Sequence, residues 1–314
     1  MLLVLHQGAI GDFLLTLSVV TSVREHLRES HVEVIASAAS ALWTAGRSAV
    51  DRCLSPETVG LHTLFTQEGP LDYRLVEILK RPTCILSFLA DQDDILHHRL
   101  DEAAAAGIVS VDPRPRPETL RAGIHITDQW AAGIRTQGWS IGPPIGSHIR
   151  RLPNMHGSNR VLLHPGGGGR HKCWPIESFV SLADEMKKHD HAVAWMLGPA
   201  ECEPGDPRCE AVRRRSAQAG EEVIIEPDLT ASAERIAASR LYIGNDGGMT
   251  HVAAATGVPT IAIFVATDPR VWRPLGKNVH VIDARTNTGN THHLLLGEIA
   301  RLIGGDEPAN CAYR

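Results

Sequence analysis

Short apolar runs alternate with helical patterns along almost the whole chain of 314 residues. Several runs are apolar at consecutive positions, which is typical of strands covered on both faces in a parallel sheet. The predicted strands are Leu2–His6, Val32–Ser37, Cys84–Leu89, Gly107–Val111, Val161–His164, Ala192–Leu197, Leu241–Gly244 and Thr260–Val265. The alternation of strands and helices predicts an α/β fold built on open parallel sheets.

The clearest helical pattern follows Pro175, a residue type that suits the start of a helix. Apolar residues recur there at the spacing that puts them on one face. They are Phe179, Leu182, Ala183 and Met186. A second amphipathic pattern predicts a helix over His292–Ile303.

The pattern weakens over residues 138–159, which hold three prolines and four glycines. Such composition is typical of a linker. Since the stretch lies near the midpoint, we expect a hinge between two Rossmann-like domains, residues 1–152 and residues 153–314. A length of 314 residues suits two domains.

The net charge of −5 gives no reason to expect nucleic acid as a partner. The six cysteines form no CxxC pair, and no basic segment opens the chain as in a signal peptide, so we expect reduced thiols in a cytoplasmic protein. Cys202 and Cys209 bracket a polar loop, but no second ligand pair has zinc-like spacing. The uncharged stretch 247–267 contains Gly257 and Pro259 and divides into a helix and a strand, which argues against a membrane span.

Three loops follow predicted strands, where open α/β domains bind ligands. The first, HQGAIGDF at residues 6–13, has Gly8 and Gly11 but lacks a complete dinucleotide fingerprint. Asp12 suits either an N-cap or a catalytic base, and the sequence leaves both open.

The second loop, HPGGGGRHKCWP at residues 164–175, differs from an ATP-binding P-loop because His171 and Cys173 flank Lys172. Free backbone amides, Arg170, Lys172 and a following helix favour a bound phosphate over a plain glycine-rich turn. The third loop, in YIGNDGGMTHVAAATGVPTIAIF at residues 242–264, leads into an alanine-rich helix that ends at Gly257. Asp246 there suits either a cap or a ligand contact, and we expect the helix N-terminus to be a second anion site.

The three loops, in this order, resemble the ADP-heptose:lipopolysaccharide heptosyltransferase family, glycosyltransferase family 9. The matching stretches extend over both halves, more loosely over residues 40–155. They are GAIGDFLLTLSVVTSVRE at 8–25, HPGGGGRHKCWPIESFVSLADEM at 164–186, LGPAE at 197–201, the third loop at 242–264 and TDPRVWRPLG at 267–276.

The resemblance implies the GT-B fold, with two facing Rossmann-like domains and a cleft between them. It implies inverting transfer of a sugar from a nucleoside diphosphate, with ADP and heptose as the expected donor parts and no metal or other cofactor. By position, Asp12 matches the family's proposed general base, and Lys172 its phosphate-contacting lysine. The residues expected to bind the donor or its diphosphate are Gly11, Gly166, Gly167, Gly168, Gly169, Arg170, Glu201, Asp246, Gly247, Gly248, Met249, Thr250 and His251.

The sequence departs from the family at three positions. Members commonly have Pro at the position of Ser18, Ser or Thr at that of Gly247, and Pro at that of Met249. Glu201 resembles the acid that holds the donor ribose, and a solvated loop carboxylate is its alternative.

The competing functions are a nucleotide-sugar epimerase and a non-catalytic nucleotide-binding relative. The acceptor is expected to be a glycan or lipid-linked molecule, which leaves both a cytoplasmic location and peripheral contact with the inner membrane open. The polar stretch 91–102 suits a solvated helix better than a cleft wall.

Overall fold

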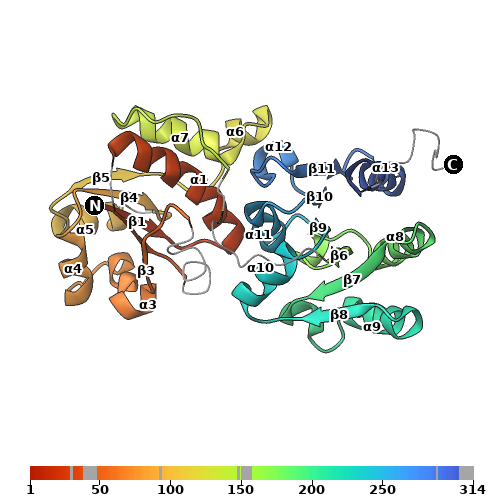
Figure 1. Ribbon diagram of the computed structural model, residues 1–314. Helices are drawn as coiled ribbons and strands as arrows, with labels where there is room; N and C mark the ends of the chain where they lie inside the picture. The colour runs from red at the N-terminus through yellow and green to blue at the C-terminus, as the bar shows by residue number, and fades with distance from the viewer. Residues whose placement is uncertain are drawn as a thin grey trace. The chain divides into compact units, whose positions relative to one another are not determined.

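The computed structural model describes residues 1–28, 31–37, 48–91, 94–146, 149, 158–287 and 289–303. The chain divides into two compact units, Met1–Arg150 and Arg151–Arg314. Each unit contains one parallel sheet, and the predicted α/β class is confirmed (Figure 1). Residues 147, 148 and 150–157 of the expected linker lie outside the described residues, as does the expected boundary at residue 152. None of the described residues of 138–159 belongs to a helix or a strand.

The first unit has a five-stranded sheet in the order β3-β2-β1-β4-β5. Its strands are β1 Leu2–His6, β2 Val32–Ile35, β3 Arg52–Leu54, β4 Cys84–Phe88 and β5 Gly107–Ser110. All pairings are parallel, and β1 lies between β2 and β4. The three inner strands are buried along their whole length, because helices cover both faces of the sheet.

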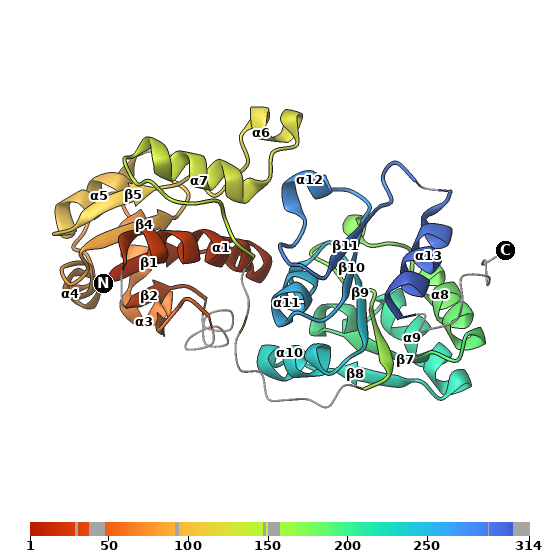
Figure 2. The same ribbon diagram turned by 45° about the horizontal axis from the view of Figure 1, so that its top comes forward.

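The helices of the first unit form two layers (Figure 2). One layer contains α1 Ile10–Leu27 and α7 Ile126–Thr136, which pack together. The other contains α3 Pro56–Val59, the 3-10 turn η1 Leu61–Phe65, α4 Tyr73–Leu79 and α5 Ile95–Ala103, whose apolar residues share a core with β1 and β4. The short helix α6 Pro117–Ala122 precedes α7. α5 buries only Leu96 and Leu100, so the polar stretch 91–102 is largely a solvated helix in its described part.

The second unit has a six-stranded parallel sheet in the order β11-β10-β9-β6-β7-β8. Its strands are β6 Arg160–His164, β7 Ala192–Leu197, β8 Glu222–Ile225, β9 Leu241–Asn245, β10 Thr260–Phe264 and β11 Val279–Asp283. The order turns back between β6 and β9, so these neighbours are far apart in the chain. Such a reversal is where open α/β sheets bind ligands.

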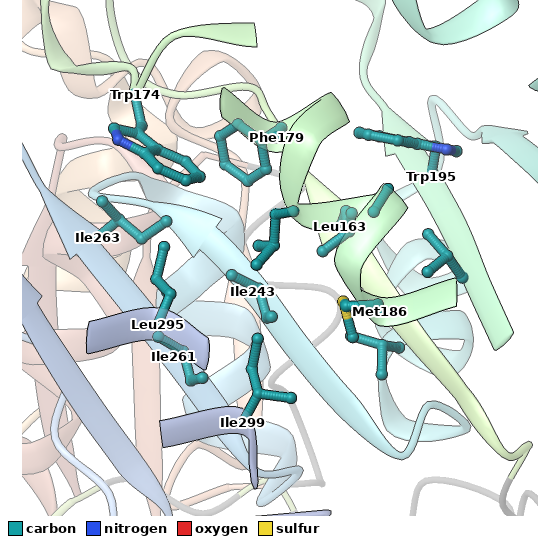
Figure 3. Packing of buried hydrophobic residues seen from close by; sticks show 14 of the residues in the cluster. Leu163, Trp174, Phe179, Met186, Trp195, Ile243, Ile261, Ile263, Leu295 and Ile299 are labelled. Atoms are coloured by element: carbon teal, nitrogen blue, oxygen red, sulfur yellow. The ribbon is translucent and has the colours of Figure 1, made fainter. Parts of the chain in front are cut away.

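Helices also cover both faces of the second sheet. α8 Ile176–Lys188, α9 Pro207–Ala219 and α13 Thr291–Ile303 bury their apolar sides in one core, where Trp174 packs edge-on against Phe179 at 5.1 Å between ring centroids (Figure 3). α10 Leu229–Ala237 and α11 Gly248–Thr256 pack together on the other face (Figure 2). The short elements are η2 Arg170–Lys172, η3 Pro199–Cys202 and α12 Pro269–Trp272.

All eight predicted strands are present, with ends that differ by no more than two residues. The helices predicted after Pro175 and over His292–Ile303 are also confirmed, as α8 and α13. The sequence did not predict β3, β8 and β11, which are edge strands of their sheets. Edge strands are partly exposed and mix polar with apolar residues, so they lack the continuous apolar run that marks an inner strand. Among the residues described, no helix combines the length and apolar character that a membrane crossing requires.

Candidate functional site

The second and third loops lie side by side at the carboxyl edge of the second sheet. β6 and β9 pair in parallel register, with His164 opposite Gly244. The glycine run therefore leaves β6 directly beside the turn that leaves β9. Segments 80 residues apart in the sequence are brought together here.

Lys172 and Asp246 meet across these two loops. The Lys172 Nζ lies 3.5 Å from Asp246 Oδ2, and the Asp246 side chain is only 8% exposed. Thr267, which follows β10, donates a hydrogen bond from its hydroxyl to the same carboxylate oxygen. Asp246 thus joins the loops that follow β6, β9 and β10.

The N-terminus of α11 adjoins this pair. Its N-cap is Gly247, with extended backbone at φ −175° and no capping side chain. The interpretation of Asp246 as the helix cap is therefore wrong. By helix geometry the N–H groups of Gly248 and Met249 have no acceptor within the helix, and the dipole favours an anion there. Thr250 and His251, one turn further, are buried.

Gly166 and Gly167 of the second loop serve close contact rather than unusual backbone angles. Neither has a left-handed backbone, and Gly169 is extended at φ 164°. A Cβ on Gly166 would lie 2.5 Å from the Glu201 carboxylate oxygen and 2.8 Å from His164 Nε2. A Cβ on Gly247 would lie 3.2 Å from Gly167 Cα, so the two turns touch through their backbones. Gly168 has open space around it and is exposed.

Arg170 and Glu201 belong to a charged network beside the loop. Arg170 is 69% exposed in its side chain and pairs with Asp206 at 3.2 Å. The Arg208 side chain forms two hydrogen bonds to Asp206 and lies 3.5 Å from Glu201 Oε1. The hydrogen bonds from Arg208 lower the pKa of Asp206 to about 2. This carboxylate therefore stays ionised and anchors both arginines.

Glu201 is buried, at 5% exposure, and accepts a hydrogen bond from the Gly198 N–H at 2.8 Å. The alternative of a solvated loop carboxylate is therefore wrong. Its carboxylate lies against Gly166, where it limits the room beneath the glycine loop. A ribose-binding role for Glu201 stays a prediction.

A buried polar chain runs beneath the loop. His164 Nδ1 lies 2.9 Å from the Tyr242 hydroxyl, which lies 3.4 Å from the Thr250 hydroxyl. Burial lowers the pKa of His164 to about 4 and raises that of Tyr242. The imidazole is therefore neutral near pH 7, and its Nδ1 can accept a hydrogen bond from the Tyr242 hydroxyl.

Asp12 lies in the first unit, in the first turn of α1 at the carboxyl end of β1, and is half-buried. The N-cap of α1 is Ala9, so the interpretation of Asp12 as the cap is wrong. Gly11 precedes Asp12 within the helix. The buried His6 accepts a hydrogen bond from the Gly8 N–H at 3.2 Å, and burial lowers its pKa to about 4. A Cβ on Gly8 would lie 2.9 Å from the His6 ring and 3.1 Å from Asp12 Cβ, so this glycine keeps the two side chains close.

The thiols of Cys202 and Cys209 lie 3.4 Å apart, and none of the five described cysteines forms a disulfide. Among the described residues, a group of three side chains whose ligand atoms could hold a metal consists of Asp91, Asp94 and His97, far from Cys202 and Cys209 in the sequence. In the described part of the chain, the two thiols therefore have no further side chains placed to complete a metal site.

Sequence reasoning missed several residues of the site. Their signal was weak, because all but His6 contact a partner far away in the chain rather than completing a local motif. They are His6, His164, Asp206, Arg208, Tyr242, Asn245 and Thr267. Asn245 precedes Asp246 directly and was the easiest of them to find.

Gly166→Ala should destabilise the second unit by about 1–3 kcal/mol, because Glu201 and His164 are both held by hydrogen bonds and have little room to move. Gly168→Ala is the matched control and should change stability by less than about 0.5 kcal/mol. Denaturant unfolding measures both. Equal effects at the two positions would contradict the close packing at Gly166.

A fall in pH should lower the free energy of unfolding of the second unit, because His164 is buried in its neutral form. The folded imidazole takes up a proton only near pH 4, whereas the unfolded one does so near 6.5. Between these values the unfolded chain binds more protons, so stability is complete above pH 6.5 and falls by about 3 kcal/mol toward pH 4. We expect His164→Asn to flatten this pH dependence of thermal unfolding, and His293→Asn, at an exposed position, to retain it. A wild-type slope in His164→Asn would remove His164 as the cause.

Residues 148–294 match the family model described as glycosyltransferase family 9 (heptosyltransferase). A curated relative, lipopolysaccharide heptosyltransferase 3 of Escherichia coli, is 28% identical over 132 residues. The alignment covers 39% of this chain and 36% of that protein, so the chain matches about a third of the relative's length.

Two solved structures share the fold over 96% of this chain. The glycosyltransferase family 9 protein of Veillonella parvula gives a TM-score of 0.71 at 15% identity, with 96% of its own chain covered. The E. coli heptosyltransferase WaaC, solved with ADP, gives 0.70 at 18% identity, with 99% of its chain covered. The fold is therefore that of the GT-B heptosyltransferases, and the segment that matches the model of glycosyltransferase family 9, residues 148–294, carries both glycine-rich loops.

Proposed function

We propose that the protein is an inverting glycosyltransferase that moves a heptose-type sugar from a nucleoside diphosphate to a glycan or lipopolysaccharide-type acceptor. ADP is the proposed nucleotide, in line with the relative solved with ADP. The observation that carries the proposal is the meeting of Lys172, Asp246 and the α11 N-terminus at one sheet edge. These groups lie within the segment that matches family 9.

The second unit holds the donor. A departing diphosphate gains negative charge as the sugar leaves, with a transition state of oxocarbenium character like that of glycoside hydrolysis. Lys172 supplies a cation there, and the amides of Gly248 and Met249 supply donors backed by the helix dipole. Arg170, exposed beside the loop and anchored by Asp206, adds a second cation. Each donor aimed at developing charge is worth about 3 kcal/mol.

Asp12 acts as the general base in this scheme. It takes the proton of the attacking acceptor hydroxyl as the new glycosidic bond forms at the anomeric carbon and the bond to the diphosphate breaks. Attack opposite the leaving group inverts the anomeric carbon. The cations and amides already named provide the charge stabilisation, so the proposal requires no metal, and a chelator should leave transfer unchanged.

The acceptor is proposed to bind the first unit and to be lipid-linked, which would bring the protein to the inner membrane surface. An epimerase would change the donor sugar without any acceptor. A non-catalytic relative would bind nucleotide and transfer nothing. Incubation of the protein with ADP-heptose, with and without a lipopolysaccharide-type acceptor, separates the three functions.

Lys172→Ala should weaken ADP binding about tenfold or more, because it removes the cation beside the proposed diphosphate. Calorimetric titration of the wild type with ADP, UDP, GDP and phosphate, without metal, establishes the nucleotide preference first. Lys277→Ala, a change at an exposed lysine before the amino end of β11, is the matched control. Unchanged ADP affinity in Lys172→Ala would remove this lysine from the site.

Asp12→Asn should reduce sugar transfer by about 10²–10⁴-fold, since the base is lost while the shape is kept. ADP affinity should stay within about threefold of wild type, because the nucleotide is bound by the other unit. Glu25→Gln, at an exposed acid on the same helix, controls for the charge change. Full transfer activity in Asp12→Asn would exclude Asp12 as the base.

A further inference from the structure

Asn245 binds both ends of the glycine loop with one side chain. Its Nδ2 donates to the carbonyl oxygens of Pro165 and Gly166, at 3.0 and 3.1 Å. Its Oδ1 accepts the Trp174 N–H at 2.8 Å. Pro165 and Trp174 are nine positions apart, so a single amide closes the base of the loop between them.

The side chain is committed to this task. Asn245 is completely buried, and both hydrogens of its amide are used on the loop backbone. Asparagine is disfavoured in strands, yet it occupies the last position of β9 in the middle of the sheet. None of these three bonds supports β9 itself, whose ladder is formed by backbone groups. The residue type at this position therefore serves the loop.

The neighbours of Asn245 hold the same loop from below. Gly247 contacts Gly167 closely enough that a Cβ on Gly247 would lie 3.2 Å from Gly167 Cα. Asp246 pairs with Lys172, near the end of the loop. The last residue of β9 and the two that follow it thus fix the start, the middle and the end of the loop.

We propose that Asn245 is a positioning residue for the donor diphosphate: it holds the 165–174 loop in the shape that presents Lys172 and the loop amides. The inference rests on the proposed function. Asn245 does not touch the donor in this scheme, because its polar atoms are buried and already bonded. By holding the loop in one shape before the donor binds, Asn245 reduces the conformational entropy that the loop would otherwise lose on binding.

The test uses Asn245→Asp, which keeps the oxygen for Trp174 but replaces the donor facing two carbonyls with an acceptor. We expect ADP affinity to fall about tenfold or more and the amides of 166–174 to exchange faster, with exchange in β6 and β9 unchanged. Asn245→Ser, a smaller change that avoids a buried charge, should give the same pattern if the aspartate variant folds poorly. Ile299→Ala removes core volume on α13 and controls for general destabilisation. It should leave the affinity for ADP within about threefold of wild type.

A double-mutant cycle separates positioning from mere stability. If Asn245 acts through the placement of Lys172, Asn245→Asp should cost clearly less affinity in a Lys172→Ala background than in the wild type. Additive losses, or wild-type affinity with unchanged loop exchange, would overturn the inference while the proposed function stands. Wild-type protein that binds no nucleoside diphosphate would instead overturn the proposed function and the donor role of Asn245 with it. Amide hydrogen exchange of residues 166–174 would then still report whether Asn245 orders the loop.

Discussion

The backbone contact between Gly167 and Gly247 is the constraint on which the candidate donor site depends. A Cβ on Gly247 would lie 3.2 Å from Gly167 Cα, so a side chain there would push the two turns apart. Their contact brings Lys172 within 3.5 Å of Asp246 and sets the glycine loop beside the N-terminus of α11. The entropy that glycine loses on folding is the cost of this approach.

Buried polar groups maintain that contact from beneath. His164, Glu201 and Asn245 are all nearly or fully buried, and each has a hydrogen-bond partner. A polar group without a partner in such surroundings would cost about 1–3 kcal/mol, so the network tolerates few alternative arrangements. The shape of the loop is thus determined by the sheet below it rather than by the glycines themselves. Gly166 and Gly167 have a defined shape because their surroundings leave them little room, whereas Gly168 is exposed.

The proposed chemistry is divided between the two units. Lys172 and Asp246 follow strands of the second sheet, and Asp12 follows β1 of the first. Both positions obey the rule that parallel sheets present their ligand sites at the carboxyl ends of strands. The family match covers the unit with the glycine loops, and the role of Asp12 derives from the motif around it. In the proposed scheme, donor binding and proton removal therefore depend on residues of different units.

The sequence by itself determined the α/β class, the inner strands and the positions of the three loops. These features are local: a buried strand needs a continuous apolar run, and a loop at its end follows from the order of elements. Edge strands such as β8 carry no such run and were not predicted. The sequence also left open whether Asp12 and Asp246 cap helices, and only the backbone at Ala9 and Gly247 decided it. The tertiary structure alone decided why the glycines are needed, that Lys172 meets Asp246, and that Asn245 closes the loop. The reason is distance in the chain, since Asn245 lies 71 residues from Trp174 and 80 from Pro165, and contacts of that kind leave no period in the sequence.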